Sequence, residues 1–97
     1  MSRPKSGPPA LTADPFFILV VDDNDYIRET FAEFLAMPEL RIVCAADGVG
    51  ASAALCTQSV NLLITDINLP DGSGLDVARE ALRQNPSLPA IVCSGHD

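Results

Sequence analysis

The sequence predicts an α/β fold in which helices pack on the faces of a parallel sheet. Four short apolar runs alternate with three segments of helical character, and the connections between them are short. The apolar runs are continuous and do not alternate with polar residues, which is typical of strands buried on both faces. This β-α-β-α-β-α-β alternation indicates a parallel sheet with helical crossovers.

The strands are predicted from the apolar runs themselves. They are 16–21 (FFILVV), 41–46 (RIVCAA), 60–65 (VNLLIT) and 90–94 (AIVCS). The first run is stopped by Asp22 and Asp23, and the third is followed by Asp66. The strands therefore end at polar residues.

The helices are predicted from apolar spacing. The first has an apolar face and ends before Pro38; its face is formed by Ile27, Phe31, Phe34 and Leu35. The second is rich in small residues and runs from Asp47-Gly48 to Leu55 or Cys56. The third starts near Ser73 and ends at Asn85-Pro86, with an apolar face formed by Leu75, Ala78 and Leu82.

Length, composition and charge argue against a second domain, a fully disordered chain and a nucleic-acid-binding protein. The 97 residues suffice for one small core, and 47% hydrophobic with 20% charged residues is typical of a globular chain. Residues 1–15 hold four of the eight prolines and are expected to form a disordered tail, which leaves 16–97 as one domain. A net charge of −7 disfavours direct contact with nucleic acid.

Localisation is expected to be cytoplasmic. The first 15 residues lack the apolar segment of a signal peptide, and no run reaches the about 18 apolar residues of a membrane span. The three cysteines are widely spaced in apolar runs, so they are expected to be reduced core residues: Cys44, Cys56 and Cys93.

Polar side chains at the strand ends form the candidate site. Ligands of parallel sheets bind beyond the carboxyl ends of the strands. If the first and third strands are neighbours, Asp22, Asp23 and Asp66 converge within a few ångströms of one another. Like charges that close repel, so the pKa of one carboxyl must rise unless a positive charge neutralises the group, and a divalent cation does this best. Oxygen ligands favour Mg²⁺. Such a site, with Asp66 as nucleophile, suits phosphoryl transfer to a carboxylate, and Ser94 on the next strand would donate a hydrogen bond to a phosphoryl oxygen.

Simpler interpretations of the same acids stay open. Asp22 and Asp23 stand at a strand-to-helix junction, where acids cap the following helix and interact with its dipole. Asp66 precedes Pro70-Asp71-Gly72, which is a turn signal. Two adjacent acids followed by Asn24 are more than one helix cap requires. Together with Asp66 at the neighbouring strand end, the pair favours a cation and phosphoryl-transfer site over a turn.

Four motifs, taken in the order in which they occur along the chain, resemble those of the response-regulator receiver domain of two-component signalling. They are FILVVDD, the AADG stretch at 45–48, LLITDINLPDGSG with Pro70 and Gly74 four and eight residues after Asp66, and LPAIVCSG with its hydroxyl residue. The resemblance covers residues 16–94 and implies a flavodoxin-like, doubly wound sheet of order 2-1-3-4-5. The chain contains only the first four strands and three helices of that pattern.

The resemblance also implies a role for each site residue. Asp66 resembles the acceptor that takes a phosphoryl group from a histidine kinase or a histidine phosphotransfer protein. Asp23 resembles the direct Mg²⁺ ligand, Asp22 assists through water, and the backbone carbonyl of Asn68 resembles the third protein ligand. Ser94 resembles the switch hydroxyl. The implied function is a phospho-accepting signalling switch, not an enzyme, that relays its state to a partner.

The sequence departs from the family in its last part. The family uses a lysine and a switch aromatic on a fifth strand, whereas the single lysine here is Lys5. The sequence ends at Asp97, so a receiver lacking its last strand and helices is expected. Its fourth strand would be an unprotected edge beside exposed apolar residues, and association between copies through that edge is expected.

Two other functions remain open. One is a receiver-like interaction module that works without phosphorylation, because the lysine and the switch aromatic are absent. The other is a phosphohydrolase of the haloacid-dehalogenase type, which also places an aspartate after an apolar strand. That family has a second aspartate two residues later, where this chain has Asn68.

Overall fold

The computed structural model describes residues 15–94. Its centre is a four-stranded parallel sheet of order β2-β1-β3-β6. The strands are β1 (Phe16–Val21), β2 (Leu40–Ala45), β3 (Leu62–Asp66) and β6 (Ala90–Cys93). The predicted tail, apart from Pro15, and the last three residues of the predicted domain lie outside the described residues. The α/β prediction with four parallel strands is confirmed.

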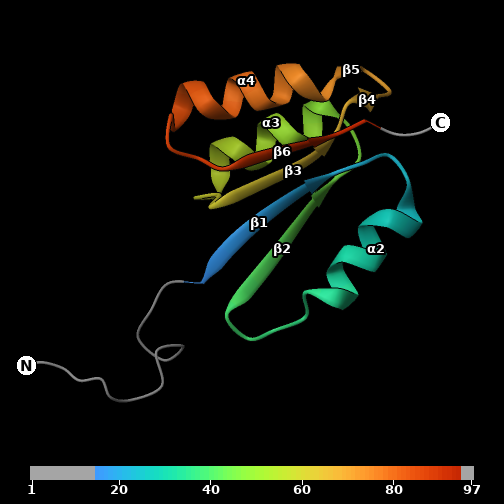
Figure 1. Cartoon of the computed structure of the whole chain (residues 1–97), viewed down its shortest axis with the longest axis vertical. Helices are drawn as coiled ribbons and strands as arrows, with labels where there is room; N and C mark the ends of the chain where they lie inside the picture. Colours follow the sequence, from blue (N-terminus) through green and yellow to red (C-terminus); the bar gives the residue numbers. More distant parts are fainter. Residues whose placement is uncertain (1–14, 95–97) are drawn as a thin grey trace, which may run out of the picture.

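Three helices cover the sheet unequally. Helix α3 (Gly48–Thr57) and helix α4 (Gly74–Gln84) lie side by side on one face, while α2 (Asp25–Phe34) lies on the other (Figure 1). Each helix starts at a side chain that accepts backbone N–H bonds of its first turn: Asn24, Asp47 and Ser73. Within residues 15–94, no helix has both the length and the hydropathy needed to cross a membrane.

The core lies between the sheet and the pair α3 and α4. Leu19 and Leu63 are completely buried in the two central strands, and Ala51 of α3 and Ala81 of α4 pack against them. Because these helix residues are small, the helices approach the sheet closely. β1 is buried on both faces over 18–21, as its continuous apolar run predicts.

The other face of the sheet is less well covered. No residue of α2 is fully buried, and Phe34, predicted to lie on its apolar face, is 80% exposed. Helix α2 packs mainly on β1 and β2, so Ile91 on the edge strand β6 remains 50% exposed. The exposed side chain of Ile91 therefore leaves apolar surface open along β6 on this face, and we call this surface the apolar strip.

Two predictions about buried residues are wrong. Leu75 and Leu82 of α4 are 42% and 38% exposed, and the buried side of the helix is formed by Gly74, Val77, Ala78 and Ala81. The close packing of Gly74 against β3 sets this rotation of the helix. All three cysteines are free and exposed, because Cys44 and Cys93 lie on the poorly covered face and Cys56 lies on the outer side of α3.

A small hairpin follows β3, at the turn signal Pro70-Asp71-Gly72. Its strands are β4 (Asn68–Leu69) and β5 (Gly72–Ser73), paired antiparallel around Pro70 and Asp71. Gly72 has a φ of 156°, a conformation that residues with a side chain rarely adopt. The base of the hairpin is closed by the Gly74 N–H, which donates to the Ile67 carbonyl at 2.7 Å.

Gly74 makes the closest approach between a helix and the sheet. A Cβ atom at this position would overlap the carbonyl oxygen of Asp66 and crowd the hydroxyl of Thr65. Thr65 is completely buried, and its hydroxyl donates to that same carbonyl at 2.9 Å. The first residue of α4 therefore rests directly on the backbone of Asp66.

We expect Gly74→Ala to lower the free energy of unfolding by about 1–3 kcal/mol, because the new methyl group meets backbone atoms that cannot rotate away. Urea unfolding followed by circular dichroism measures this. Arg79→Ala on the exposed side of the same helix is the control and should change stability by no more than about 0.5 kcal/mol. A Gly74→Ala variant as stable as the wild type would contradict the close approach.

Candidate functional site

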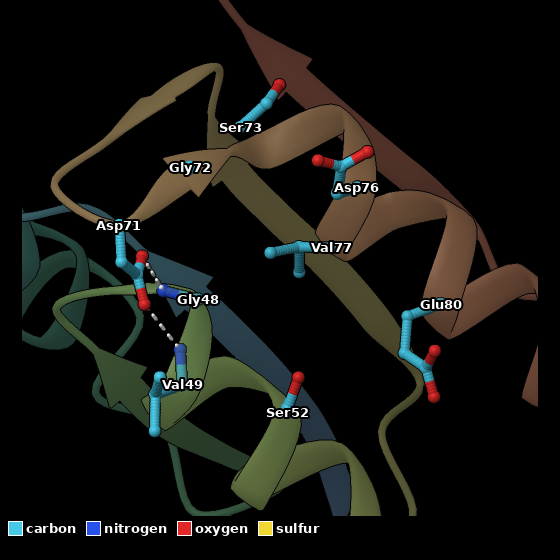
Figure 2. A pocket seen from close by; sticks show the side chains of 9 residues that line it. All are labelled: Gly48, Val49, Ser52, Asp71, Gly72, Ser73, Asp76, Val77 and Glu80. Carbon is cyan, nitrogen blue, oxygen red and sulfur yellow. Dashed lines mark hydrogen bonds between the residues drawn. The ribbon is translucent and has the colours of Figure 1, made fainter.

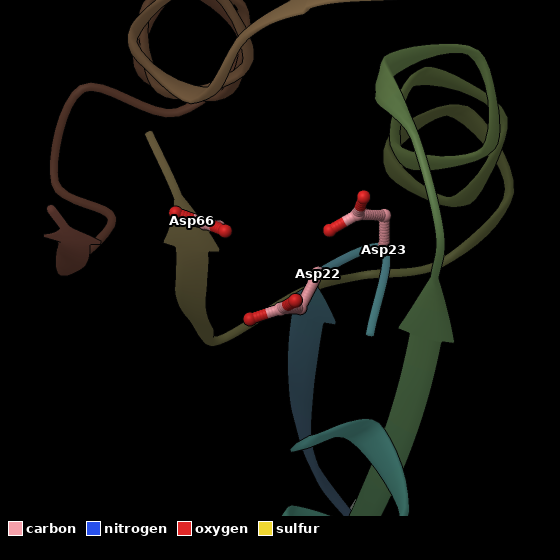
Figure 3. Close-up of side chains that lie close together, drawn as sticks. All are labelled: Asp22, Asp23 and Asp66. Carbon is pink, nitrogen blue, oxygen red and sulfur yellow. The ribbon is translucent and has the colours of Figure 1, made fainter. Parts of the chain in front are cut away.

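The register of the sheet brings three carboxylates together. Val21 of β1 pairs with Thr65 of β3, so the next residues, Asp22 and Asp66, emerge side by side at the same edge. Asp22, Asp23 and Asp66 each offer a carboxylate oxygen, and these oxygens lie within 4.8 Å of one another. Figure 3 shows the three side chains turned toward a shared space beyond the strand ends. The structure thus has the convergence that the strand order predicted.

Ladder hydrogen bonds continue past both strand ends and fix the backbone there. The Asp22 N–H donates to the Ala45 carbonyl at 3.0 Å, and the Ile67 N–H donates to the Cys93 carbonyl at 2.9 Å. Asp22 and Asp66 therefore lie on backbone that a neighbouring strand holds in place. This rigidity suits a site whose ligands need fixed positions.

The helix-capping interpretation of the acid pair does not hold. Asn24 is the residue that caps α2, with its side-chain oxygen accepting from the N–H groups of Tyr26 and Ile27 at 2.8 and 3.3 Å. Asp22 accepts the N–H of Asn24 at 2.9 Å with one oxygen. No hydrogen bond or ion pair within residues 15–94 engages the side chain of Asp23, which is exposed. Asp23 is therefore available to a ligand.

Arg28 contacts the backbone of the acid pair, and this contact was not predicted from the sequence. One guanidinium N–H donates to the Asp22 carbonyl at 2.7 Å, and the group also forms an ion pair with Asp25. The side chain is only 20% exposed. The signal in the sequence is the i,i+3 spacing of Asp25 and Arg28 in the first turns of a helix that follows the acids.

The same guanidinium influences a neighbouring thiol. Partial burial raises the pKa of Cys44, although the residue as a whole is exposed, and the positive charge of Arg28 opposes that shift. Arg28 thus influences Cys44 of β2 as well as the backbone of the acid pair.

The two remaining candidate residues lie beside the carboxylates. Asn68 begins the hairpin, and its N–H points to a carboxylate oxygen of Asp66 at the long distance of 3.4 Å. Ser94 follows the residue that pairs with Asp66 across β3 and β6, and it is exposed. Within residues 15–94 no hydrogen bond joins Ser94 to Asp66. Pairing of β4 with β5 turns the chain at Pro70-Asp71, and within residues 15–94 the side chain of Asp66 adds to this segment only the long hydrogen bond from Asn68.

Asp71 at the tip of the hairpin is a second residue that sequence reasoning did not single out. Its carboxylate accepts the N–H of Gly48 at 2.7 Å and the N–H of Val49 at 3.0 Å, at the start of α3 (Figure 2). These two hydrogen bonds lower the pKa of Asp71 below its ordinary value of 3.8. An acid at a hairpin tip and an Asp-Gly helix start are visible in the sequence, but their contact is not.

The donor set fits Mg²⁺. Three carboxylates and a nearby backbone carbonyl are hard oxygen ligands, and Mg²⁺ takes one or two carboxylates while keeping several waters. None of the ion pairs within residues 15–94 neutralises Asp22, Asp23 or Asp66. The cluster is partly open to solvent, with Asp23 exposed, so a hydrated cation has access.

Comparison with known proteins decides the family. Residues 18–97 match the model described as the response regulator receiver domain. The chain belongs to the receiver domain family. Among curated relatives, this receiver is 36% identical over 83 residues to a probable transcriptional regulatory protein, TcrX, of Mycobacterium tuberculosis, covering 86% of this chain and 36% of the relative. It is 30% identical to the regulatory protein VirG of Agrobacterium fabrum, covering 90% and 34%.

Solved receiver structures share the fold. The CheY-like receiver of Methanospirillum hungatei aligns with a TM-score of 0.79 and 26% identity, covering 87% of this chain and 67% of that one. The response regulator TrrA of Thermotoga maritima, solved in complex with Mg²⁺ and BeF, aligns with a TM-score of 0.75 and 33% identity, covering 84% and 71%. The present receiver spans about a third of the length of these two curated relatives.

Asp71→Asn should destabilise the receiver at neutral pH, and the deficit should shrink in acid. The folded pKa of Asp71 is lowered, so the ionised carboxylate stabilises the fold above the unfolded value of 3.8 and loses that effect as pH falls through the folded pKa. Urea unfolding of both proteins between about pH 7 and about pH 3 measures the difference.

Asp76→Asn is the matched control, because it removes the same charge. The Asp76 carboxylate pairs with Arg79 at 3.0 Å and, within residues 15–94, does not accept the backbone N–H groups at a helix start. Its deficit at neutral pH should be smaller than that of Asp71→Asn. A deficit for Asp71→Asn that is equally large at both ends of the pH range would contradict the role of the ionised carboxylate.

Proposed function

We propose that this receiver accepts a phosphoryl group on Asp66 in the presence of Mg²⁺, from a histidine kinase or a histidine phosphotransfer protein. The observation that supports this most directly is the cluster of Asp22, Asp23 and Asp66, whose ligand oxygens lie within 4.8 Å of one another at the sheet edge. The match of residues 18–97 to the receiver family adds the expectation of a kinase partner.

Each residue has a role in this proposal. Asp23 is the direct Mg²⁺ ligand, since its side chain is exposed, and Asp22, with one oxygen already bonded to Asn24, assists through water. The backbone carbonyl of Asn68 completes the protein ligands. Ser94, one residue beyond the Asp66–Cys93 pair, donates its hydroxyl to a phosphoryl oxygen after transfer.

The chemistry is attack by a carboxylate on phosphorus. A carboxylate oxygen of Asp66 forms the new O–P bond as the P–N bond of the donor phosphohistidine breaks, and the departing imidazole nitrogen keeps the electron pair and takes up a proton. Bound Mg²⁺ supplies positive charge that offsets the repulsion between the phosphoryl oxygens and the aspartates. The chain's own contribution is to hold the nucleophile in line on rigid backbone.

The receiver then acts as a cytoplasmic switch that relays its state to a partner, rather than as an enzyme that turns over a substrate. Its curated relatives include proteins named as transcriptional regulators and proteins named as protein-glutamate methylesterases, so their outputs differ. The residues described here favour no particular output.

Incubation with Mg²⁺ and acetyl phosphate should add one phosphoryl group, measured by intact mass. Asp66→Asn should abolish the gain, because an amide is not a nucleophile of comparable strength. Asp25→Asn, next to the cluster and paired with Arg28, is the control of equal charge change and should retain it. The gain should disappear when Mg²⁺ is chelated.

Two outcomes would count against the proposal. Equal phosphorylation of wild type and Asp66→Asn would place the acceptor elsewhere. Mg²⁺ binding that depends on Asp23 without any phosphorylation would support the alternative of an interaction module that works without phosphorylation. That alternative is motivated by the position of the single lysine, Lys5, far from Asp66 in the sequence.

The proposal includes association between copies of the 97-residue chain through β6. This strand lies at the edge of the sheet, and Ile91 on its poorly covered face is 50% exposed. An unpaired edge next to an apolar strip favours pairing with another chain.

Light scattering coupled to size exclusion should show a mass that rises with concentration in the micromolar range. Ile91→Lys should reduce association, because a charge on the edge strand opposes pairing. Val49→Lys, at an apolar residue of α3 that is 72% exposed, is the control and should behave like the wild type. A wild-type chain that stays monomeric at all these concentrations would refute association.

A further inference from the structure

The β4–β5 hairpin carries one of the proposed ligands and is anchored at both ends. At its base the Gly74 N–H bonds to the Ile67 carbonyl at 2.7 Å, directly after Asp66. At its tip Asp71 reaches two backbone amides of α3. Asn68 lies between these anchors, with its N–H directed at Asp66. The position of Asn68 relative to Asp66 therefore depends on both anchors.

The anchor at the tip joins segments that are distant in sequence. Asp71 lies 23 residues after Gly48, and its two oxygens are divided between the amides of Gly48 and Val49. Helix α3 already has its own cap, since Asp47 accepts the N–H of Gly50 at 2.8 Å. Asp71 thus adds a contact between the helix and the hairpin beyond what the local cap provides.

Helix α3, to which the hairpin tip is attached, is held firmly in the core. Ala51, Ala54 and Leu55 of α3 are buried in the core, so the first turn of this helix has a fixed position relative to the sheet. The helix N-terminus also attracts an ionised carboxylate through its unpaired amides and its dipole. The lowered pKa of Asp71 agrees with a carboxylate that stays charged while it holds this contact.

We propose that Asp71 is a positioning residue of the acceptor site: by fixing the hairpin tip to α3, it holds Asn68 at the distance from Asp66 that Mg²⁺ binding requires. Asp71 does not touch the cluster itself, so it acts through Asn68. The inference rests on the proposed function only in naming Mg²⁺, since the anchoring of the hairpin is a property of the chain alone.

A purely stabilising role for Asp71 makes a different prediction. If the contact only lowered the free energy of the fold, Mg²⁺ affinity measured under conditions where every variant is fully folded would not change. If the contact positions Asn68, the affinity falls even in fully folded protein. Ligand-supporting residues of metal sites commonly affect metal affinity in this way.

The experiment compares the 97-residue wild type with Asp71→Asn, Asp71→Ala and Asp76→Asn by nuclear magnetic resonance. MgCl₂ titration gives the dissociation constant of Mg²⁺, and hydrogen exchange of the Gly74 amide reports on the base of the hairpin. Asp76 is the matched control because it lines the same groove between α3 and α4 (Figure 2) and loses the same charge.

We expect Asp71→Asn to weaken Mg²⁺ binding by about tenfold, as for other residues that support metal ligands, and Asp71→Ala to weaken it at least as much. Asp76→Asn should change it by about twofold or less, as for an exposed surface charge. The Gly74 amide should exchange faster in both Asp71 variants and at the wild-type rate in Asp76→Asn.

Unchanged Mg²⁺ affinity in the two Asp71 variants, or equal weakening by Asp76→Asn, would overturn the positioning role. A wild type that binds no Mg²⁺ would contradict the proposed function instead. In that case hydrogen exchange of the Gly74 amide, compared with that of the Leu19 amide in the core, decides whether Asp71 places the hairpin. Faster exchange at Gly74 alone supports the anchor, and an unchanged rate or an equal increase at both amides overturns it.

Discussion

The parallel pairing of β1 with β3 is the constraint on which the site depends. It sets Asp22 and Asp66 side by side at the sheet edge, because Val21 pairs with Thr65 directly before them. With one more strand between them, the carboxylates would be about 10 Å apart, beyond the reach of a single cation. A slip of one residue would turn Asp66 to the other face of the sheet. The cluster is therefore a consequence of register, which the apolar strands enforce.

The two sides of the site are held by different kinds of contact. On the β1 side the contacts are local: Asn24 caps α2, and Arg28 returns to the Asp22 carbonyl from the next turn of the helix. On the β3 side the contacts join segments that are farther apart in the sequence. Gly74 packs against the backbone of Asp66, and Asp71 accepts hydrogen bonds from α3. Asp66 thus lies where β3, the hairpin and the first residue of α4 meet.

Much of the fold followed from the sequence because its strongest signals are periodic. The unbroken run at 16–21 predicted a central strand, and β1 spans those residues. The strand order implied by the family resemblance, in which the first and third strands are neighbours, predicted that the three aspartates converge, and they do. Their roles as ligand and acceptor, and those of Asn68 and Ser94, stay predictions.

The parts that could not be foreseen depend on tertiary contacts. The buried side of α4 is set by Gly74 packing on β3, so Leu75 and Leu82 turned outward despite their spacing. Cys44 and Cys93 are exposed because one face of the sheet is poorly covered. Asp71 and Arg28 act through hydrogen bonds with backbone groups of other segments, and only the folded chain shows which groups these are.

The central claim is that Asp66 is the nucleophile of a Mg²⁺ site made by strand register. The most direct test is to treat the chain with acetyl phosphate and Mg²⁺, reduce with borohydride, and sequence the peptides by mass spectrometry. Borohydride converts an aspartyl phosphate to homoserine and leaves free aspartate unchanged. We expect homoserine at position 66, and only when Mg²⁺ is present. Homoserine at Asp22 or Asp23, or labelling of Asp66 that is independent of Mg²⁺, would contradict it.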